Sequence, residues 1–297
     1  MSVIQRVLAE PPPEYVFEIT EAAISAASSR RPAQPSVEIL EERGLSPSPS
    51  TPNLLKPQLY RDALARISAA ARPKRARTAL VIPDYAVRMA ILDFEEFPTS
   101  EDERAALLRF RLRKSVPFPI DEAQLSYAVQ LNEPRRIEVL AVAIARPILH
   151  EYESIFTDAG FRVGMVTPSS IAALPLCMKP EKGLTLLAKA AGPILSVFLL
   201  ESSRVRLVRC LDMGDVEGGA LEAYFVPVLH QTLAFAEDQI GTPVGRVLLC
   251  GFGPKTEAIG RNAEQEFGIP YTPVGSRFGA ASPESAGLLG LLEQYAA

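Results

Sequence analysis

The sequence lacks the long apolar run that a membrane-spanning helix requires. No apolar stretch reaches about 18 residues. The opening MSVIQRVLAEPPPEY also lacks a basic start followed by a long apolar segment, which a secretory signal would need. We therefore expect a cytoplasmic protein without its own anchor, which associates with a membrane only through partners.

Cysteine and histidine are scarce. The three cysteines, Cys177, Cys210 and Cys250, lie far apart in apolar segments without a CxxC pattern, which predicts reduced core residues. His150 and His230 fall in separate predicted helices, and neither lies near a serine or cysteine nucleophile with a matching acid. The sequence thus predicts no metal site and no independent catalytic group.

Excess positive charge is also absent. The chain has 31 basic and 35 acidic residues and a net charge of -4, so its overall field does not attract nucleic acid. With 297 residues, 47% of them hydrophobic, it is long enough for two lobes with separate cores. We expect a globular protein whose partners are not nucleic acids.

The periodicity of the first half predicts strands and helices in a mixed α/β order. Tyr15 to Ala27 alternates like a strand that turns into a second strand. The proline-rich stretch Ser46 to Pro57 predicts a loop, ordered or partly mobile. A compact block then predicts the order strand, strand, helix, strand, strand, at 79–83, 87–94, 101–115, 125–131 and 137–145.

The second half repeats this mixture. An apolar strand at 194–200, the turn Ser202-Ser203 and a strand at 205–211 predict a hairpin. Apolar residues from Leu221 to Phe235 recur at helical spacing and predict a long helix that ends near Gly241. A strand at 247–250, a glycine turn and a helix at 256–267 that stops at Gly268 complete the pattern.

Two stretches are the most specific of the chain, LVIPDYAVRMAILDF at 80–94 and KSVPFPIDEAQLSYAV at 114–129. In this order along the chain they resemble the PilM family of type IV pilus assembly proteins. Four others agree and extend the resemblance over most of the chain, at 46–57, 150–174, 229–241 and 247–270.

This resemblance implies a two-lobed actin-like (ribonuclease H-like) α/β fold with a nucleotide cleft between the lobes. The first lobe is expected at residues 14–77 and 148–170, and the second at residues 171–297. A strand-strand-helix-strand-strand subdomain is expected to be inserted in the first lobe at residues 78–147.

The resemblance also implies a place in the inner-membrane platform of the type IV pilus. There the chain is expected to act as a scaffold that binds the cytoplasmic tail of a PilN-like membrane protein and contacts other platform proteins. The sequence does not decide whether the chain forms a homodimer. The turn Pro117-Phe118-Pro119 is the candidate rim of the tail-binding groove. A cytoplasmic component of a type II secretion platform is an alternative.

The residues that the family would use for ATP and Mg²⁺ are altered. An actin-like site needs two glycine-containing phosphate turns and a carboxylate near the metal. The first turn has Glu18, Thr20 and Glu21 without a glycine, and Glu21 would repel phosphate. The second, at Leu187 to Gly192, offers Lys189 and a displaced Gly192. The nucleoside-side turn survives in part as Gly251-Phe252-Gly253.

Each lost phosphate contact forgoes a charge-assisted hydrogen bond of about 1.5–3 kcal/mol. We therefore predict that ATP and Mg²⁺ bind weakly or not at all and that the chain is not an enzyme. The candidate, and here vestigial, nucleotide residues are Glu18, Thr20, Lys189, Gly192, Gly251 and Gly253. The alternative is an active ATPase switch in which Glu18 and Lys189 contact the nucleotide and lobe closure changes partner affinity.

Overall fold

A five-stranded mixed sheet forms the first lobe of this computed structural model, which describes residues 12–68, 76–178, 183–214 and 220–295. The strand order is β3-β2-β1-β4-β8, with β1 to β3 antiparallel and β4 and β8 parallel to β1. The strands are β1 (Tyr15–Ile19), β2 (Ala23–Ser28), β3 (Ser36–Ile39), β4 (Arg77–Ile82) and β8 (Arg162–Pro168).

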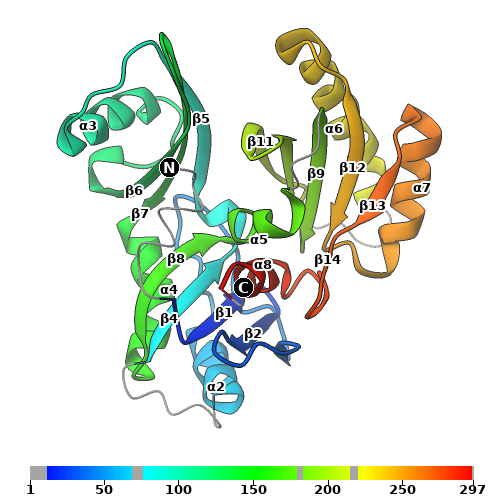
Figure 1. The fold of residues 1–297 in the computed structure, drawn as a ribbon. Coiled ribbons are helices and arrows are strands. Elements are labelled where there is room, and N and C mark those ends of the chain that lie inside the picture. The colour runs from blue at the N-terminus through cyan, green and yellow to red at the C-terminus, as the bar shows by residue number, and fades with distance from the viewer. Residues whose placement is uncertain (1–11, 69–75, 179–182, 215–219, 296–297) are drawn as a thin grey trace.

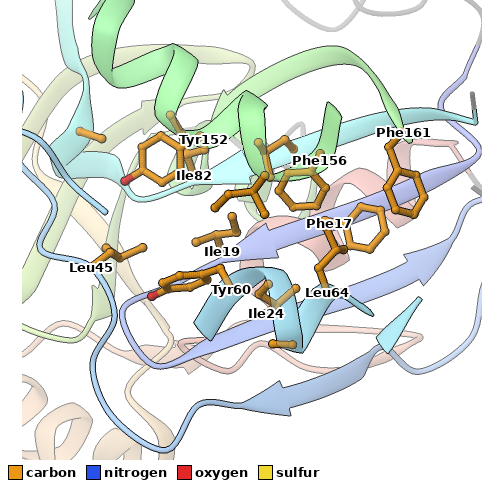
Figure 2. Close-up of a cluster of buried hydrophobic side chains, with 14 of the residues drawn as sticks. Phe17, Ile19, Ile24, Leu45, Tyr60, Leu64, Ile82, Tyr152, Phe156 and Phe161 are labelled. Carbon is orange, nitrogen blue, oxygen red and sulfur yellow. The ribbon is translucent and has the colours of Figure 1, made fainter. Parts of the chain in front are cut away.

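One face of this sheet packs against α2 (Pro57–Ile67) and α4 (Arg146–Asp158). Aromatic rings fill the space between them, and Figure 2 shows Phe17 beside Phe156 and Phe161. Alternate residues of β1 point into this core because side chains of a strand alternate between its two faces. The intervening residue Glu18 therefore points to the opposite face, toward the cleft.

The opposite face of the first sheet packs against α5 (Ser169–Cys177) and α8 (Ala286–Tyr295). The predicted division placed residues 171–297 in the second lobe, but α8 contacts β1 and β2 of the first. Gly287 and Gly290 explain this position, because a Cβ atom at Gly290 would lie 2.0 Å from the carbonyl oxygen of Ala172. Without side chains there, α8 can cross α5 closely.

The second lobe repeats the topology of the first. Its strand order is β11-β10-β9-β12-β13, with β9 to β11 antiparallel and β12 and β13 parallel to β9. The strands are β9 (Leu184–Ala191), β10 (Ile194–Glu201), β11 (Arg204–Asp212), β12 (Val244–Cys250) and β13 (Tyr271–Pro273). The predicted hairpin of β10 and β11 is confirmed.

Two helical segments cover one face of the second sheet. They are α6 (Ala220–Phe235), which continues as the π-helical turn η3 (Ala236–Ile240), and α7 (Thr256–Phe267). Gly241 and Gly268 end them in left-handed conformations, with φ of 72° and 68°. Both predicted helix ends are therefore confirmed. The short 3-10 turn η4 (Gly253–Lys255) and the small hairpin β14 (Gly275–Ser276) and β15 (Gly279–Ala280) complete this part.

The inserted subdomain consists of a three-stranded antiparallel sheet in the order β5-β7-β6 and a covering helix, α3. Its elements are β5 (Arg88–Phe94), α3 (Glu101–Leu112), the turn η2 (Ile120–Glu122), β6 (Ala123–Glu133) and β7 (Arg136–Ala145). The fourth strand predicted here, at 79–83, is instead β4 of the first sheet, because it pairs with β1 and β8 and is buried on both faces. The insertion therefore has strand-helix-strand-strand order.

The insertion also contacts the second lobe, which lies across from it in Figure 1. The side-chain amide of Gln130 donates to the Val205 carbonyl at 3.0 Å and accepts from the Val205 N–H at 2.8 Å. Arg204 lies 3.6 Å from the buried carboxylate of Glu138. These contacts join the insertion to β11 independently of the cleft floor.

The proline-rich loop at 46–57 is ordered through Asn53, which is fully buried. Its amide donates to the carbonyls of Ser48 and Thr51 at 2.7 and 2.8 Å, and its oxygen accepts from the Tyr152 hydroxyl at 2.8 Å. The carboxylate of Glu151 accepts from its backbone N–H at 2.8 Å. Of the two predicted states of the loop, the ordered one is observed, anchored to α4.

Candidate functional site

The two sheets place one charged residue each at the floor of the interlobe cleft. Glu18 lies in β1 opposite Ser25 of β2, and Lys189 lies in β9 opposite Ser196 of β10. Because β1 and β9 are the central first strands of sheets with the same order, Glu18 and Lys189 occupy equivalent positions in the two lobes. The cleft therefore has a carboxylate on one side and an ammonium on the other.

A cavity of about 140 Å³ lies between these residues. Four of the six predicted nucleotide residues line it, namely Glu18, Thr20, Lys189 and Gly192. The remaining lining residues include Glu21, Arg43, Asp84, Ser169 and Glu284. The lining thus combines four carboxylates with two basic side chains and has an excess of negative charge.

Lys189 is the most deeply buried cation of this cavity, with a side chain that is 0% exposed. Its Nζ lies 3.7 Å from Oδ2 of Asp84, and within the described chain no acceptor is placed to form a hydrogen bond with it. Burial lowers the pKa of Lys189, but Asp84 and Glu18 outweigh this effect and the pKa is raised. The ammonium is therefore retained by charge.

Glu18 is only 1% exposed. Its carboxylate accepts hydrogen bonds from the Ser169 hydroxyl and, at 2.8 Å, from the N–H of Leu288 in α8. Burial raises the pKa of Glu18, and the nearby Lys189 opposes that rise. Glu18 thus connects β1 with α5 and α8 beneath the cleft.

Asp84 joins the two lobes directly. It lies in the turn η1 (Asp84–Ala86) after β4, and its carboxylate accepts from the N–H and the hydroxyl of Ser170 in α5. The same carboxylate accepts from the Ser196 hydroxyl of β10 at 2.8 Å. Sequence reasoning did not single out this residue, although a carboxylate two residues after a largely buried strand was an available signal.

The two hairpin turns at the cleft mouth touch each other. Gly192 has φ of 57°, and a Cβ atom there would lie 3.1 Å from a carboxylate oxygen of Glu21. Arg43 lies 3.8 Å from the same carboxylate. Leu187 to Ala191 were predicted as part of a phosphate turn, but they belong to β9, because this apolar segment forms a buried central strand.

Gly251 and Gly253 follow β12, outside the lining of this cavity. Both have positive φ, 74° and 56°. A Cβ atom at Gly251 would lie 2.3 Å from the carbonyl oxygen of Ala190, so this glycine permits close contact between β12 and β9. Between the two glycines, Phe252 is buried against Phe225 of α6 at 5.5 Å between ring centroids.

The predicted partner turn Pro117-Phe118-Pro119 lies in the insertion, between α3 and η2. Both prolines are exposed, while Phe118 packs partly against the core of the insertion. None of the three lines the interlobe cavity. The candidate partner surface and the cleft are therefore separate, and the role of this turn stays a prediction.

Comparison with known proteins identifies the fold. No protein-family model and no curated protein sequence match the chain. A chain of a PilM–PilN type IV pilus biogenesis complex superposes with a TM-score of 0.77 at 17% identity, covering 97% of this chain and 100% of that one. A Bacteroides thetaiotaomicron protein with an actin-like ATPase fold and unknown function gives a TM-score of 0.52 at 11% identity, covering 97% and 98%.

The chain has the actin-like fold. A further similar structure is the cytoplasmic domain of EpsL, an inner-membrane component of the type II secretion system of Vibrio cholerae. It gives a TM-score of 0.51 at 14% identity and covers 95% of this chain and 93% of that one. At such identities the similarity concerns the actin-like fold alone. None of the helices in the described ranges is long and apolar enough to cross a membrane.

Proposed function

We propose that this actin-like chain is a PilM-like scaffold of a type IV pilus inner-membrane platform, located in the cytoplasm and held at the membrane by its partners. Its ligand is the cytoplasmic tail of a PilN-like membrane protein, and binding needs no nucleotide. The observation that carries the proposal is the end-to-end similarity to a chain of the PilM–PilN complex, with 97% and 100% coverage and a TM-score of 0.77.

Independence from nucleotide is supported by the contents of the cleft. The cavity of about 140 Å³ is smaller than the roughly 300–1,000 Å³ of typical small-molecule sites. Its excess of carboxylates, from Glu18, Glu21, Asp84 and Glu284, repels a triphosphate. The Lys189 ammonium lies 3.7 Å from Oδ2 of Asp84 and also interacts with the charge of Glu18, so it competes with a metal ion for these carboxylates. The residues present therefore do not fit Mg-ATP.

Partner binding is assigned to the insertion. The exposed prolines Pro117 and Pro119 flank the half-buried Phe118, and together they offer a rigid apolar rim to an extended tail. The separation of this turn from the cleft means that a tail could bind there without entering the cleft. This placement predicts that changes at the turn affect tail binding and leave the lobes unchanged.

A cytoplasmic component of a type II secretion platform is the second candidate. The similarity to the cytoplasmic domain of EpsL favours it. The two candidates differ in the membrane partner, so the choice of tail peptide separates them. Preference for a tail from a secretion-platform protein over a PilN-like tail would replace the first proposal by the second.

Isothermal titration with a synthetic tail peptide tests the proposal. We expect the PilN-like peptide to bind with the same affinity in buffer and in millimolar Mg-ATP, and a scrambled peptide to give no heat. The variant Pro117→Ala/Pro119→Ala should weaken binding without changing the melting temperature. Binding that appears only with Mg-ATP would support the alternative of an active nucleotide switch and contradict the scaffold.

A further inference from the structure

The cleft floor contains two buried carboxylates that face a single tethered cation. Glu18 and Asp84 belong to the first lobe, are 1% and 4% exposed, and approach from strand β1 and from the turn η1. Lys189 reaches them from β9 of the second lobe and is likewise 1% exposed. The nearest approach, 3.7 Å between Nζ and Asp84 Oδ2, crosses from one lobe to the other.

The hydrogen bonds show that both carboxylates are used as acceptors. Asp84 accepts from Ser170 twice and from Ser196 once, and Glu18 accepts from Ser169 and Leu288. Ionised carboxylates are the form that accepts at every oxygen. Two such groups buried near each other repel and lose hydration, so a cation close to them stabilises their ionised form.

Lys189 meets this requirement without a hydrogen bond. Its Nζ has no acceptor in hydrogen-bonding geometry among the described residues, so charge rather than a directed bond fixes its position. An ammonium group that is positioned by charge alone occupies its site as a free monovalent cation would. The register of β9 also fixes it, because Lys189 lies between Ser196 of β10 and Cys250 of β12 in the same row of the sheet.

We propose that the Lys189 ammonium is a built-in cation that fills a cation site formed by Glu18 and Asp84. It holds the two lobes together in place of a metal ion or a metal-nucleotide complex. The site takes one monovalent cation of ammonium type, supplied by the chain itself. This inference concerns the cleft alone and is independent of the partner that the insertion binds.

Chemical rescue tests the inference. The variant Lys189→Ala removes the side chain beyond Cβ and leaves a space of the shape of propylammonium. We expect it to lower the melting temperature by roughly 5–15 °C. Added propylammonium chloride should restore at least half of the loss, whereas the neutral 1-propanol and equal ionic strength of sodium chloride should restore none. Equal rescue by 1-propanol, or rescue by neither compound, would overturn the proposal.

A matched control lies two residues away on the same strand. Leu187 faces the same side of β9 and is fully buried, and the variant Leu187→Ala opens a cavity without exposing charge. Propylammonium should not raise its melting temperature. A similar rise for Leu187→Ala would show that the cation acts on cavities in general and would overturn the proposal.

A second pair of variants keeps the test decisive if Lys189→Ala does not fold. Lys189→Met preserves the volume of the side chain and leaves two uncompensated carboxylates, whereas Lys189→Met/Asp84→Asn removes one of these charges. We expect the double variant to melt at a higher temperature than Lys189→Met, or to fold where Lys189→Met does not. A double variant that melts no higher and folds no better would contradict a cation site.

Discussion

The two lobes have the same strand order and differ in the charge at the equivalent position of the first strand. Glu18 lies opposite Ser25 in the first lobe, and Lys189 lies opposite Ser196 in the second. If both equivalent positions carried a carboxylate, the two lobes would need an external cation in order to approach each other. With opposite charges they attract each other, and the second lobe carries its own cation into the first.

The two serines show the same asymmetry. The Ser25 hydroxyl donates to the Glu284 carbonyl at 2.6 Å, next to α8 on its own lobe. The Ser196 hydroxyl donates to Asp84 at 2.8 Å across the cleft. Ser25 thus stabilises its own lobe, whereas Ser196 at the equivalent position of the second lobe forms a contact between the lobes.

Neutralising the second lobe's charge should have the largest effect. The variant Lys189→Met leaves Glu18 and Asp84 buried without a cation, and we expect the free energy of unfolding to fall by about 3–5 kcal/mol. Guanidinium denaturation measures this change. The control Lys255→Met, at a partly exposed lysine of η4, should stay within about 0.5 kcal/mol of the parent. Equal losses for both variants would contradict the account.

Removing the hydroxyls of Ser25 and Ser196 in separate variants should show that these equivalent positions have different roles in the two lobes. Ser196→Ala deletes a hydrogen bond to a carboxylate and should lower the free energy of unfolding by about 1.5–3 kcal/mol. Ser25→Ala deletes a bond to a neutral carbonyl and should lower it by about 0.5–1.5 kcal/mol. Urea denaturation of both variants provides the comparison. A larger loss for Ser25→Ala would reverse the asymmetry that we infer.

Two glycines compare helix packing in the two lobes. Gly290→Ala places a Cβ against the backbone of α5 in the first lobe, and we expect a loss of about 1–3 kcal/mol from overpacking. In the second lobe, a Cβ at Gly260 would meet the ring of Tyr271 at 2.2 Å. Because a side chain can shift more easily than the backbone that Gly290→Ala would meet, Gly260→Ala should be the milder change in thermal melts of the two variants.

Alkaline titration should give the smallest effect. The pKa of Lys189 is raised above its ordinary 10.5, so from that pH upward the unfolded chain loses this proton before the folded chain does. Stability from Lys189 is therefore complete below pH 10.5 and is lost as pH rises toward the folded pKa, by up to about 1.4 kcal/mol per pH unit.

The stability difference between the parent and Lys189→Met follows this term together with the effect of Lys189 on its neighbours, since Lys189 also lowers the pKa of Cys250. Other groups facing the cleft floor, Cys210 and Cys250 with pKa raised to about 12, and Glu18 and Asp84, are common to both proteins. Denaturation at increasing pH should show the difference shrinking above pH 10.5. A difference that stays constant would mean that Lys189 stabilises the fold by packing rather than by charge.

The sequence predicted those elements whose signals lie within a few neighbouring residues. The hairpin of β10 and β11, and the helix ends at Gly241 and Gly268, follow from apolar runs, turn residues and glycine conformations. The short, largely exposed strand β3 has too few residues to show a period. The end of β9, from Leu187 to Ala191, was predicted as part of a phosphate turn because the family resemblance implies one directly before the strand at 194–200.

Tertiary contacts decided the remaining features. The position of α8 on the first sheet depends on a close crossing with α5, and no local pattern specifies the partner of an apolar helix. The role of Asp84 depends on Ser170 and Ser196, which are distant in the sequence. The sequence showed a lysine at position 189, where a phosphate turn was expected. Its role became clear only from the carboxylates of Glu18 and Asp84 that it faces in the structure.

The melting temperature of the parent protein tests the central claim most directly, in buffer with EDTA, with Mg²⁺ alone and with millimolar Mg-ATP. If the chain supplies its own cation, the three melting temperatures should agree within about 1 °C, because neither Mg²⁺ nor Mg-ATP binds the folded state. A rise of several degrees with Mg-ATP, or a fall with EDTA, would contradict the claim and show that the cleft still uses an external ligand.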